Sequence, residues 1–170
     1  MLSVNDTLEE RIGILLKDRG LTVGTVESAT GGLISHRLTG VAGSSDYYLG
    51  SIVSYSNDVK SRVVGVKTDS ISRYGAVSAT VAEQMADGGR ALLKVDICLS
   101  DTGIAGPGGG SARKPVGLFY LGLACKQGTF SRKHIFHGDR TLNKQAAAQV
   151  ALQWLEDYLT GKWVPGLSRT

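Results

Sequence analysis

The stretch LTVGTVESATGGLISHRLTGVAGSSDYYLGSIVSY, residues 21–55, places a strand, a helix and a second strand in succession. Residues 21–26 are few and rich in β-branched side chains, which favours a strand. A Gly-Gly pair then opens a helical stretch over residues 30–38, and the run over residues 47–55 favours a second strand. This alternation predicts an α/β fold.

Helices and strands continue to alternate on both sides of this unit. Leucine and isoleucine at a helical spacing predict a first helix that Asn5 or Asp6 caps and that ends at Gly20. On the C-terminal side the apolar patterns predict, in order, helix 57–66, helix 78–93, strand 95–100, strand 116–125, strand 129–136 and helix 139–160.

The connection between the last two strands decides the kind of sheet. Only residues 126–128 join these strands, which permits a hairpin but no helical crossover. The sequence therefore predicts a three-layer α/β/α sandwich with a mixed, mostly parallel sheet of five or six strands. We expect one domain over residues 1–162, followed by a loose tail over residues 163–170.

The predicted helix over residues 78–93 carries two local signals. Thr80 and Glu83 stand at the spacing of a capping box, which predicts the start of the helix there. Gly88 and Gly89 lie inside the helix, where each costs about 1 kcal/mol relative to alanine. We therefore expect a close packing contact at these two glycines.

The composition fits an ordinary globular domain. The chain has 170 residues, of which 42% are hydrophobic and 20% charged, which excludes a disordered or fibrous protein. The net charge of +4 comes from an excess of basic residues in the second half, without a Lys/Arg-rich run. This charge suits a small phosphorylated ligand as well as nucleic acid, so nucleic acid is not the expected partner.

The cysteines and the N-terminus indicate a location. Cys98 and Cys125 lie in separate apolar runs, and two thiols form neither a disulfide framework nor a four-ligand zinc site. They fit buried thiols in a reducing compartment. The N-terminus has no apolar signal core, and the chain has no run of eighteen apolar residues. We expect a cytoplasmic protein with no membrane contact.

Residues 27–32, Glu-Ser-Ala-Thr-Gly-Gly, form the first candidate functional segment. A strand ends here in small hydroxyl residues, and a glycine pair opens a helix. Backbone N–H groups at such a place suit an anion or an oxyanion. The alternative is an ordinary helix cap in which Ser28 or Thr30 supplies the capping hydroxyl.

The second segment is residues 101–110, DTGIAGPGGG, which directly follows a predicted buried strand. Ligands of open α/β sheets collect beyond the carboxyl ends of strands, and glycines let the backbone approach a ligand closely. The segment lacks the Lys-Ser/Thr pair of a Walker A motif and the glycine order of a dinucleotide fingerprint, so neither a kinase nor a dehydrogenase is supported. The alternative is a flexible surface loop.

The third segment joins a serine to a lysine across the predicted strand 47–55. Ser45 precedes the strand and Lys60 follows it. A serine hydroxyl attacks a carbonyl only when a base removes its proton, and the histidines here form no conventional triad. A lysine with a lowered pKa can act as that base, and Tyr55 could relay or orient the proton.

Six sequence motifs of this chain resemble those of one protein family. They are ESATGG (27–32), GSSDYYLGSIVSYSNDVK (43–60), GVKTDSISRYGAVS (65–78), TGIAGPGGG (102–110), KPVG (114–117) and GDR (138–140). Together they resemble the C-terminal domain of CinA, the competence/damage-inducible protein, over about residues 5–160. One departure is Ala29, where many relatives have cysteine.

The resemblance implies an amidohydrolase. It would convert nicotinamide mononucleotide to nicotinate mononucleotide and ammonia, in pyridine-nucleotide salvage, with no cofactor and no metal. It also implies a homo-oligomer, and a stand-alone copy without the N-terminal domain of full-length CinA.

The family pattern implies a nucleophile at Ser45 and a base at Lys60. Ser28, Tyr55 and Thr102 would complete the catalytic site. The expected substrate-binding residues lie in the glycine-rich segments and at one arginine, with the glycine loop holding the phosphate: Thr30, Gly31, Gly32, Gly103, Gly106, Gly108 and Arg140.

Two rival functions come from other classes. A domain of this fold could be a nucleotide-binding regulatory module that turns nothing over, because fold alone does not guarantee function. The basic second half also permits a DNA-linked accessory protein. Release of ammonia from the mononucleotide would separate the enzyme from both.

Overall fold

The computed structural model describes residues 6–165 of the chain. Its strands are β1 (Val23–Glu27), β2 (Tyr48–Val53), β3 (Ile97–Gly103), β4 (Leu118–Cys125) and β5 (Gly128–Ile135). Its α-helices are α1 (Leu8–Arg19), α2 (Leu33–Thr39), α3 (Asn57–Arg62), α4 (Thr68–Tyr74), α5 (Ala79–Leu93) and α6 (Arg140–Leu159), and a short 3₁₀ turn η1 covers Ser44–Asp46.

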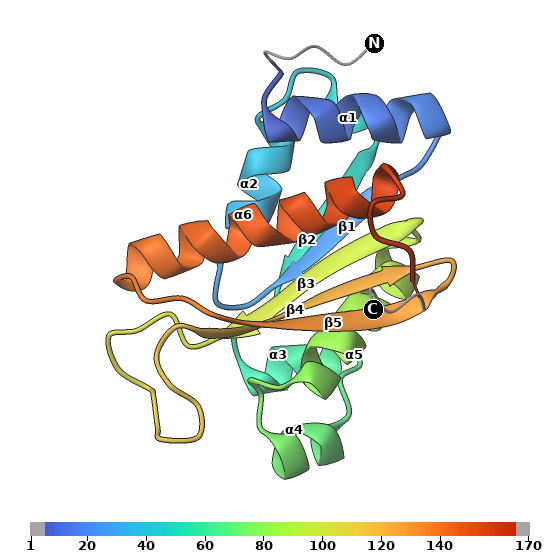
Figure 1. Ribbon diagram of the computed structural model, residues 1–170. Coiled ribbons are helices and arrows are strands. Elements are labelled where there is room, and N and C mark those ends of the chain that lie inside the picture. Colours follow the sequence, from blue (N-terminus) through green and yellow to red (C-terminus); the bar gives the residue numbers. More distant parts are fainter. Residues whose placement is uncertain (1–5, 166–170) are drawn as a thin grey trace.

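The five strands form one mixed sheet in the order β2-β1-β3-β4-β5. β1 pairs in parallel with both β2 and β3, whereas β4 runs antiparallel to β3 and forms a hairpin with β5. Helices α1, α2 and α6 cover one face of the sheet, and α3, α4 and α5 cover the other (Figure 1). The predicted α/β/α sandwich with a mixed sheet is confirmed.

Side chains alternate between two cores because successive residues of a strand point to opposite faces. Leu99 and Phe119 belong to the larger core, beneath α1, α2 and α6. Val26 and Cys98 belong to the smaller core, with Val81 and other residues on the α5 side. Both cysteines are free and buried, as predicted. No helix within residues 6–165 has the length and hydropathy needed to cross a membrane.

The helix starts differ from the sequence expectations. Thr7 caps α1 through a capping box with Glu10, rather than Asn5, which lies outside the described residues, or Asp6. Ser78 caps α5 by accepting a hydrogen bond from the Val81 amide, so the predicted capping box at residues 80–83 is wrong. Helix α4 was not predicted, because its seven residues carry too few apolar positions to show a period.

Trp163, the first residue of the predicted loose tail, packs against the domain. Trp163 packs edge-to-face against Trp154 and Phe130, with ring centroids 5.2 and 5.3 Å apart. The Arg132 guanidinium lies 5.2 Å from the Trp163 ring centroid. Residue 163 is therefore part of the packed domain, and residues 166–170 lie outside the described part of the chain.

Gly88 and Gly89 make the close contact that the sequence predicted. A Cβ on Gly88 would lie 1.9 Å from the Val64 carbonyl oxygen, and one on Gly89 would lie 2.2 Å from Cγ2 of Val26. Helix α5 therefore packs against the chain at a distance that only glycine permits.

We predict that Gly88→Ala lowers the free energy of unfolding by about 2 kcal/mol, because the overpacked contact outweighs the gain of roughly 1 kcal/mol in helix propensity. Urea denaturation measures this change. Gly108→Ala is the control, since a Cβ there meets nothing within 4 Å and should change stability by less than about 0.5 kcal/mol. A stabilised Gly88→Ala protein would contradict the packing argument.

Candidate active site

The site lies at the carboxyl edge of the two neighbouring parallel strands β1 and β2. Their register pairs Glu27 with Val53, so both chains leave the sheet at the same edge. Ser28 follows β1 directly, and Lys60 lies on α3, which begins four residues after β2 ends. The Lys60 Nζ lies 2.9 Å from the Ser28 Oγ. Parallel pairing thus joins two side chains that are 32 residues apart in sequence.

Lys60 is buried to an unusual degree for a lysine, with 2% of its surface exposed. Its Nζ donates to the carbonyl oxygens of Ser54 at 2.7 Å and Tyr55 at 3.4 Å. Burial lowers the pKa of Lys60, and the negative charge of Asp101 opposes this shift. A neutral amine has two N–H groups and one lone pair. As an ammonium, Lys60 donates its third N–H to the Ser28 Oγ; as a neutral amine, with its two N–H groups on the carbonyls, it would turn its lone pair toward the Ser28 hydroxyl.

Asp101 fixes the turn that carries Ser28. Its fully buried carboxylate accepts hydrogen bonds from the backbone N–H groups of Ser28, Ala29 and Thr30, at 3.0, 2.9 and 3.1 Å. The Thr30 hydroxyl also donates to it. Burial raises the pKa of Asp101 to about 6, against the opposing effect of these hydrogen bonds. The turn is therefore organised around an internal anion.

The Glu27 carboxylate binds the backbone N–H groups at the start of α2. Its buried carboxylate accepts from the backbone N–H groups of Gly32 at 2.8 Å, Ile34 at 3.1 Å and Ser35 at 2.8 Å. The Thr30 hydroxyl oxygen lies 2.6 Å from it and also contacts the Asp101 carboxylate, and its single hydrogen is donated to one of the two carboxylates at a time. The sequence predicted that amides of this segment would bind an outside anion or an oxyanion. That prediction is wrong for Gly32 and for the three amides that Asp101 occupies, because the chain's own carboxylates take them.

A cavity of about 240 Å³ opens beside the Ser28–Lys60 pair. Its lining residues come from the ends of β1 and β3, from α3, from the segment before α5 and from the start of α6: Ser28, Ala29, Tyr55, Asn57, Lys60, Ala76, Val77, Thr102, Gly103, Ala105 and Arg140. The structure thus brings together four of the five predicted catalytic residues, with the predicted Gly103 and Arg140.

Tyr55 and Arg140 form the outer wall of this cavity. The Tyr55 side chain is exposed, and its hydroxyl accepts a hydrogen bond of 3.1 Å from Nη2 of Arg140. Nη1 of Arg140 donates to the Gly106 carbonyl oxygen at 2.9 Å. The Tyr55 hydroxyl keeps its own hydrogen for another acceptor. The Thr102 hydroxyl, in contrast, is buried and donates to the Ala76 carbonyl oxygen at 2.9 Å.

Ser45 lies elsewhere. It is an exposed residue of η1, ahead of the amino end of β2, where Tyr48 pairs with Val23. Lys60 lies beyond the carboxyl end of the same six-residue strand, and at about 3.3 Å per residue the strand separates them by roughly 20 Å. The structure contradicts the predicted pairing of Ser45 with Lys60. A spacing of fifteen residues places the two side chains at opposite edges of the sheet.

The glycine loop between β3 and β4 also differs from its expected role. It extends away from the sheet (Figure 1). Gly108 is exposed with open space around it, and neither it nor Gly106 lines the cavity. Gly106 is buried against Val116 at a φ of 96°. Gly106 and Gly108, which were expected from the sequence to hold the phosphate, therefore lie outside the lining of the active-site cavity.

Two residues of the site were not singled out from the sequence. Asp101 stood inside a glycine-rich segment without a role, since nothing in a sequence shows that a carboxylate points back at the amides of a turn 72 residues away. Asn57 follows the Tyr55-Ser56 pair at the start of α3 and faces the cavity. Its place before Lys60 on one short helix was the available signal. Within residues 6–165 no group of three His, Cys, Asp or Glu side chains has metal-site geometry.

Comparisons with known proteins agree on one family. The CinA C-terminal domain profile matches residues 5–159. A CinA-like protein from Salinibacter ruber is 52% identical over 147 residues, which is 86% of this chain and 36% of that protein. A CinA-like protein from Geobacter sp. is 45% identical over 162 residues, 95% of this chain and 39% of that protein. The chain thus spans little more than a third of these curated relatives.

Solved structures show the same fold. The competence/damage-inducible protein CihA from Agrobacterium tumefaciens superposes with a TM-score of 0.84 at 38% identity, covering 94% of this chain and 99% of that one. The competence damage-inducible protein A from Klebsiella pneumoniae gives a TM-score of 0.87 at 29% identity, covering 90% of this chain and 95% of that one.

Proposed function

The chain belongs to the family of the CinA C-terminal domain, and we propose that it is an amidohydrolase with Ser28 as nucleophile and Lys60 as general base. The observation that carries this proposal is the 2.9 Å contact between the Lys60 Nζ and the Ser28 Oγ. A nucleophile within hydrogen-bond reach of a base with a lowered pKa, on the wall of a cavity, is the arrangement that covalent catalysis needs.

The reaction has two halves. Neutral Lys60 takes the proton of the Ser28 hydroxyl as the oxygen attacks the carboxamide carbon, which gives a tetrahedral oxyanion. The Lys60 ammonium then gives this proton to the leaving nitrogen, the C–N bond breaks, and ammonia departs from an ester on Ser28. In the second half Lys60 deprotonates a water molecule that attacks the ester, and the proton returns to the Ser28 oxygen.

The oxyanion needs donors that the protein has not already used. The amides of Ser28, Ala29 and Thr30 are occupied by Asp101, which removes the usual backbone donors beside a nucleophile. The Tyr55 hydroxyl still has its hydrogen to donate. The guanidinium of Arg140 orients that hydroxyl, so we assign Tyr55 as the donor and Arg140 as its positioning residue.

The proposed substrate is nicotinamide mononucleotide, which would leave as nicotinate mononucleotide. This identity rests on the resemblance to the CinA family, and the chemistry of the site supports it. A pyridinium cation beside Lys60 would disfavour the protonated form of the amine, since two like charges repel in a partly buried site. Lys60 would then be in its basic form while the substrate is bound.

On this proposal, Ser28→Ala lowers the rate of ammonia release from nicotinamide mononucleotide by at least about a thousandfold, as expected for loss of a covalent nucleophile. Ser45→Ala is the matched control and should keep a rate within about threefold of the wild type. Nicotinamide and NAD serve as comparison substrates. Strong loss in Ser45→Ala with a functional Ser28→Ala protein would reverse the assignment.

The pH profile tests Lys60 separately. Only the neutral amine is a base, so the rate should rise with pH along an acidic limb that follows the pKa of Lys60. Lys60→Arg should be inactive at every pH tested, because a guanidinium does not give up its proton.

Asp101→Asn sharpens that test, because it removes the charge that raises the pKa of Lys60. The acidic limb of its residual activity should move to lower pH, and Asp58→Asn on the exposed surface should leave the limb in place. An active Lys60→Arg protein, or a limb that moves to higher pH in Asp101→Asn, would rule out Lys60 as the base.

A further inference from the structure

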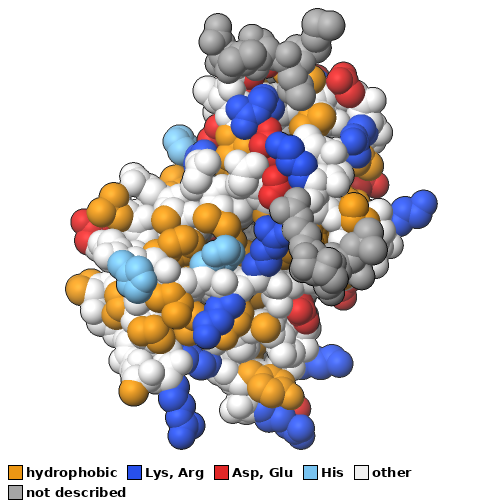
Figure 2. All heavy atoms as spheres, viewed as in Figure 1, with side chains coloured by type: hydrophobic (Ala, Val, Ile, Leu, Met, Phe, Trp, Pro, Cys, Tyr) orange, Lys and Arg blue, Asp and Glu red, His pale blue; other side chains and the backbone are white. Residues whose placement is uncertain are grey.

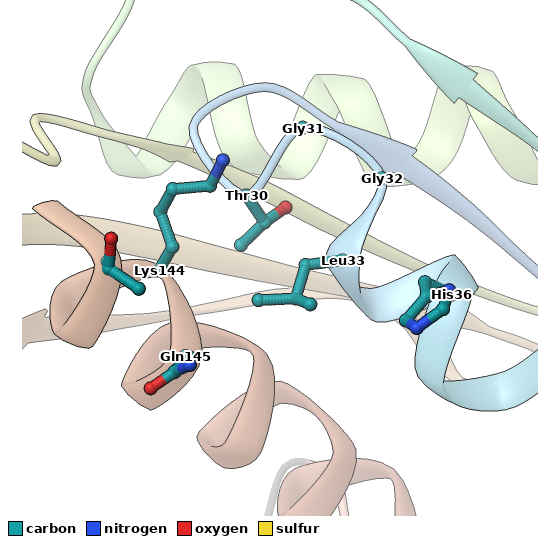
Figure 3. Close-up of a pocket in the computed structure, with 8 residues that line it drawn as sticks. Thr30, Gly31, Gly32, Leu33, His36, Lys144 and Gln145 are labelled. Atoms are coloured by element: carbon teal, nitrogen blue, oxygen red, sulfur yellow. The ribbon is translucent and has the colours of Figure 1, made fainter. Parts of the chain in front are cut away.

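A second cavity, of about 380 Å³, shares the turn after β1 with the active-site cavity. Ser28 and Ala29 line the active-site cavity, and Thr30 and Gly31 line the second one. The opposite wall of the second cavity is α6, from which the side chain of Lys144 reaches toward the turn (Figure 3), and Thr141 and Gln145 complete this wall. One turn of backbone therefore separates the two cavities.

Lys144 is the charged group of this second cavity. Its side chain is half-buried, and its ammonium reaches toward the Thr30–Gly31 turn (Figure 3). The Nζ lies 3.6 Å from the position that a Cβ on Gly31 would occupy. Among residues 6–165 no hydrogen bond or ion pair engages this ammonium, and none of the lining residues is acidic. A half-buried ammonium without a counter-ion favours an anionic ligand.

The neutral lining residues suit the same ligand. Thr141 and Gln145 add a hydroxyl and a carboxamide as donors beside Lys144. The amide of Gly32 is occupied by Glu27, so side chains rather than this backbone group would hold an anion here. Gly31 has a φ of 66° and no Cβ, which keeps the approach to the ammonium open.

Helix α6 connects the two cavities. Arg140 lines the active-site cavity and Lys144 lines the second, four residues further on. Residues at that spacing share a face of a helix and are separated by about 6 Å along its axis. A ligand that lies along the first turns of α6 would thus present one end to Ser28 and its other end to Lys144.

We infer that the second cavity is the subsite for the phosphate monoester of the substrate, with Lys144 as its ionic partner. The phosphate carries between one and two negative charges near neutral pH, and in this cavity it would meet a cation and no carboxylate. This inference rests on the proposed function, because the carboxamide at Ser28 determines where the other end of the substrate lies. It moves the phosphate site from the glycine loop to the α2–α6 side of the turn.

Basic side chains on the face seen in Figure 2 are spread among acidic and uncharged ones, with no broad basic surface there.

The kinetic test compares nicotinamide mononucleotide with nicotinamide riboside, which lacks the phosphate. The preference for the mononucleotide is measured as the ratio of the two kcat/KM values. Lys144→Gln removes a charge-assisted contact to the phosphate, so this ratio should be lower than in the wild type by about tenfold or more, mainly because KM for the mononucleotide rises. The control is Lys126→Gln, an exposed lysine of the β4–β5 connection, which should leave the ratio as it is. Equal losses for both substrates in Lys144→Gln would overturn the phosphate subsite.

A binding test does not depend on turnover. Calorimetry should show that ribose 5-phosphate binds the wild type and Ser28→Ala alike, and binds Lys144→Gln about tenfold or more weakly. If the wild type releases no ammonia but binds ribose 5-phosphate through Lys144, the proposed function fails and the subsite stands. If the wild type is active while its affinity for ribose 5-phosphate is the same in Lys144→Gln, the subsite fails and the proposed function stands.

Discussion

The buried carboxylate of Asp101 is the constraint on which the site depends. A carboxylate without solvent is costly unless its oxygens receive donors, and here the amides of Ser28, Ala29 and Thr30 supply them. The turn after β1 therefore closes around the Asp101 side chain near the end of β3, and in this arrangement the Ser28 hydroxyl lies beside Lys60. The same charge opposes the lowering of the Lys60 pKa by burial. One side chain thus positions the proposed nucleophile and opposes the effect of burial on the pKa of the proposed base.

Sheet topology supplies the second half of the arrangement. Because β1 and β2 run in parallel, the segments after these strands collect at one edge of the sheet, and the segments before them collect at the other. Ser28 and Lys60 both follow these strands and therefore lie at the same edge of the sheet. Ser45 precedes β2 and therefore lies at the opposite edge, away from Lys60. Because these amides are occupied, the donors in the proposed function are side chains: Tyr55, next to Arg140, for the oxyanion, and Lys144 for the phosphate.

The sequence predicted more of the fold than of the site. Alternating strands and helices gave the three layers, the three-residue connection 126–128 gave the hairpin, and the cost of Gly88 and Gly89 inside a helix pointed to a close contact that exists. The site depends on strand pairing and on hydrogen bonds between distant residues, which the spacing of residues in the sequence does not reveal. Ser45 and Ser28 are equivalent as residue types, and only the register of β1 with β2 separates them. From the sequence, the backbone amides at the start of a helix are expected to be free to bind a ligand. In the structure the amides of Thr30 and Gly32 already donate to the carboxylates of Asp101 and Glu27.

The proposed mechanism places the acyl group on one identifiable serine during turnover. The protein is mixed with nicotinamide mononucleotide, quenched in acid during turnover and digested with trypsin, and the peptides are analysed by mass spectrometry. Cleavage after Arg19, Arg37 and Lys60 separates Ser28, in peptide 20–37, from Ser45, in peptide 38–60. With Ser28 as the nucleophile, the nicotinate mononucleotide ester is expected on peptide 20–37, at Ser28. The same ester on peptide 38–60 would contradict this assignment.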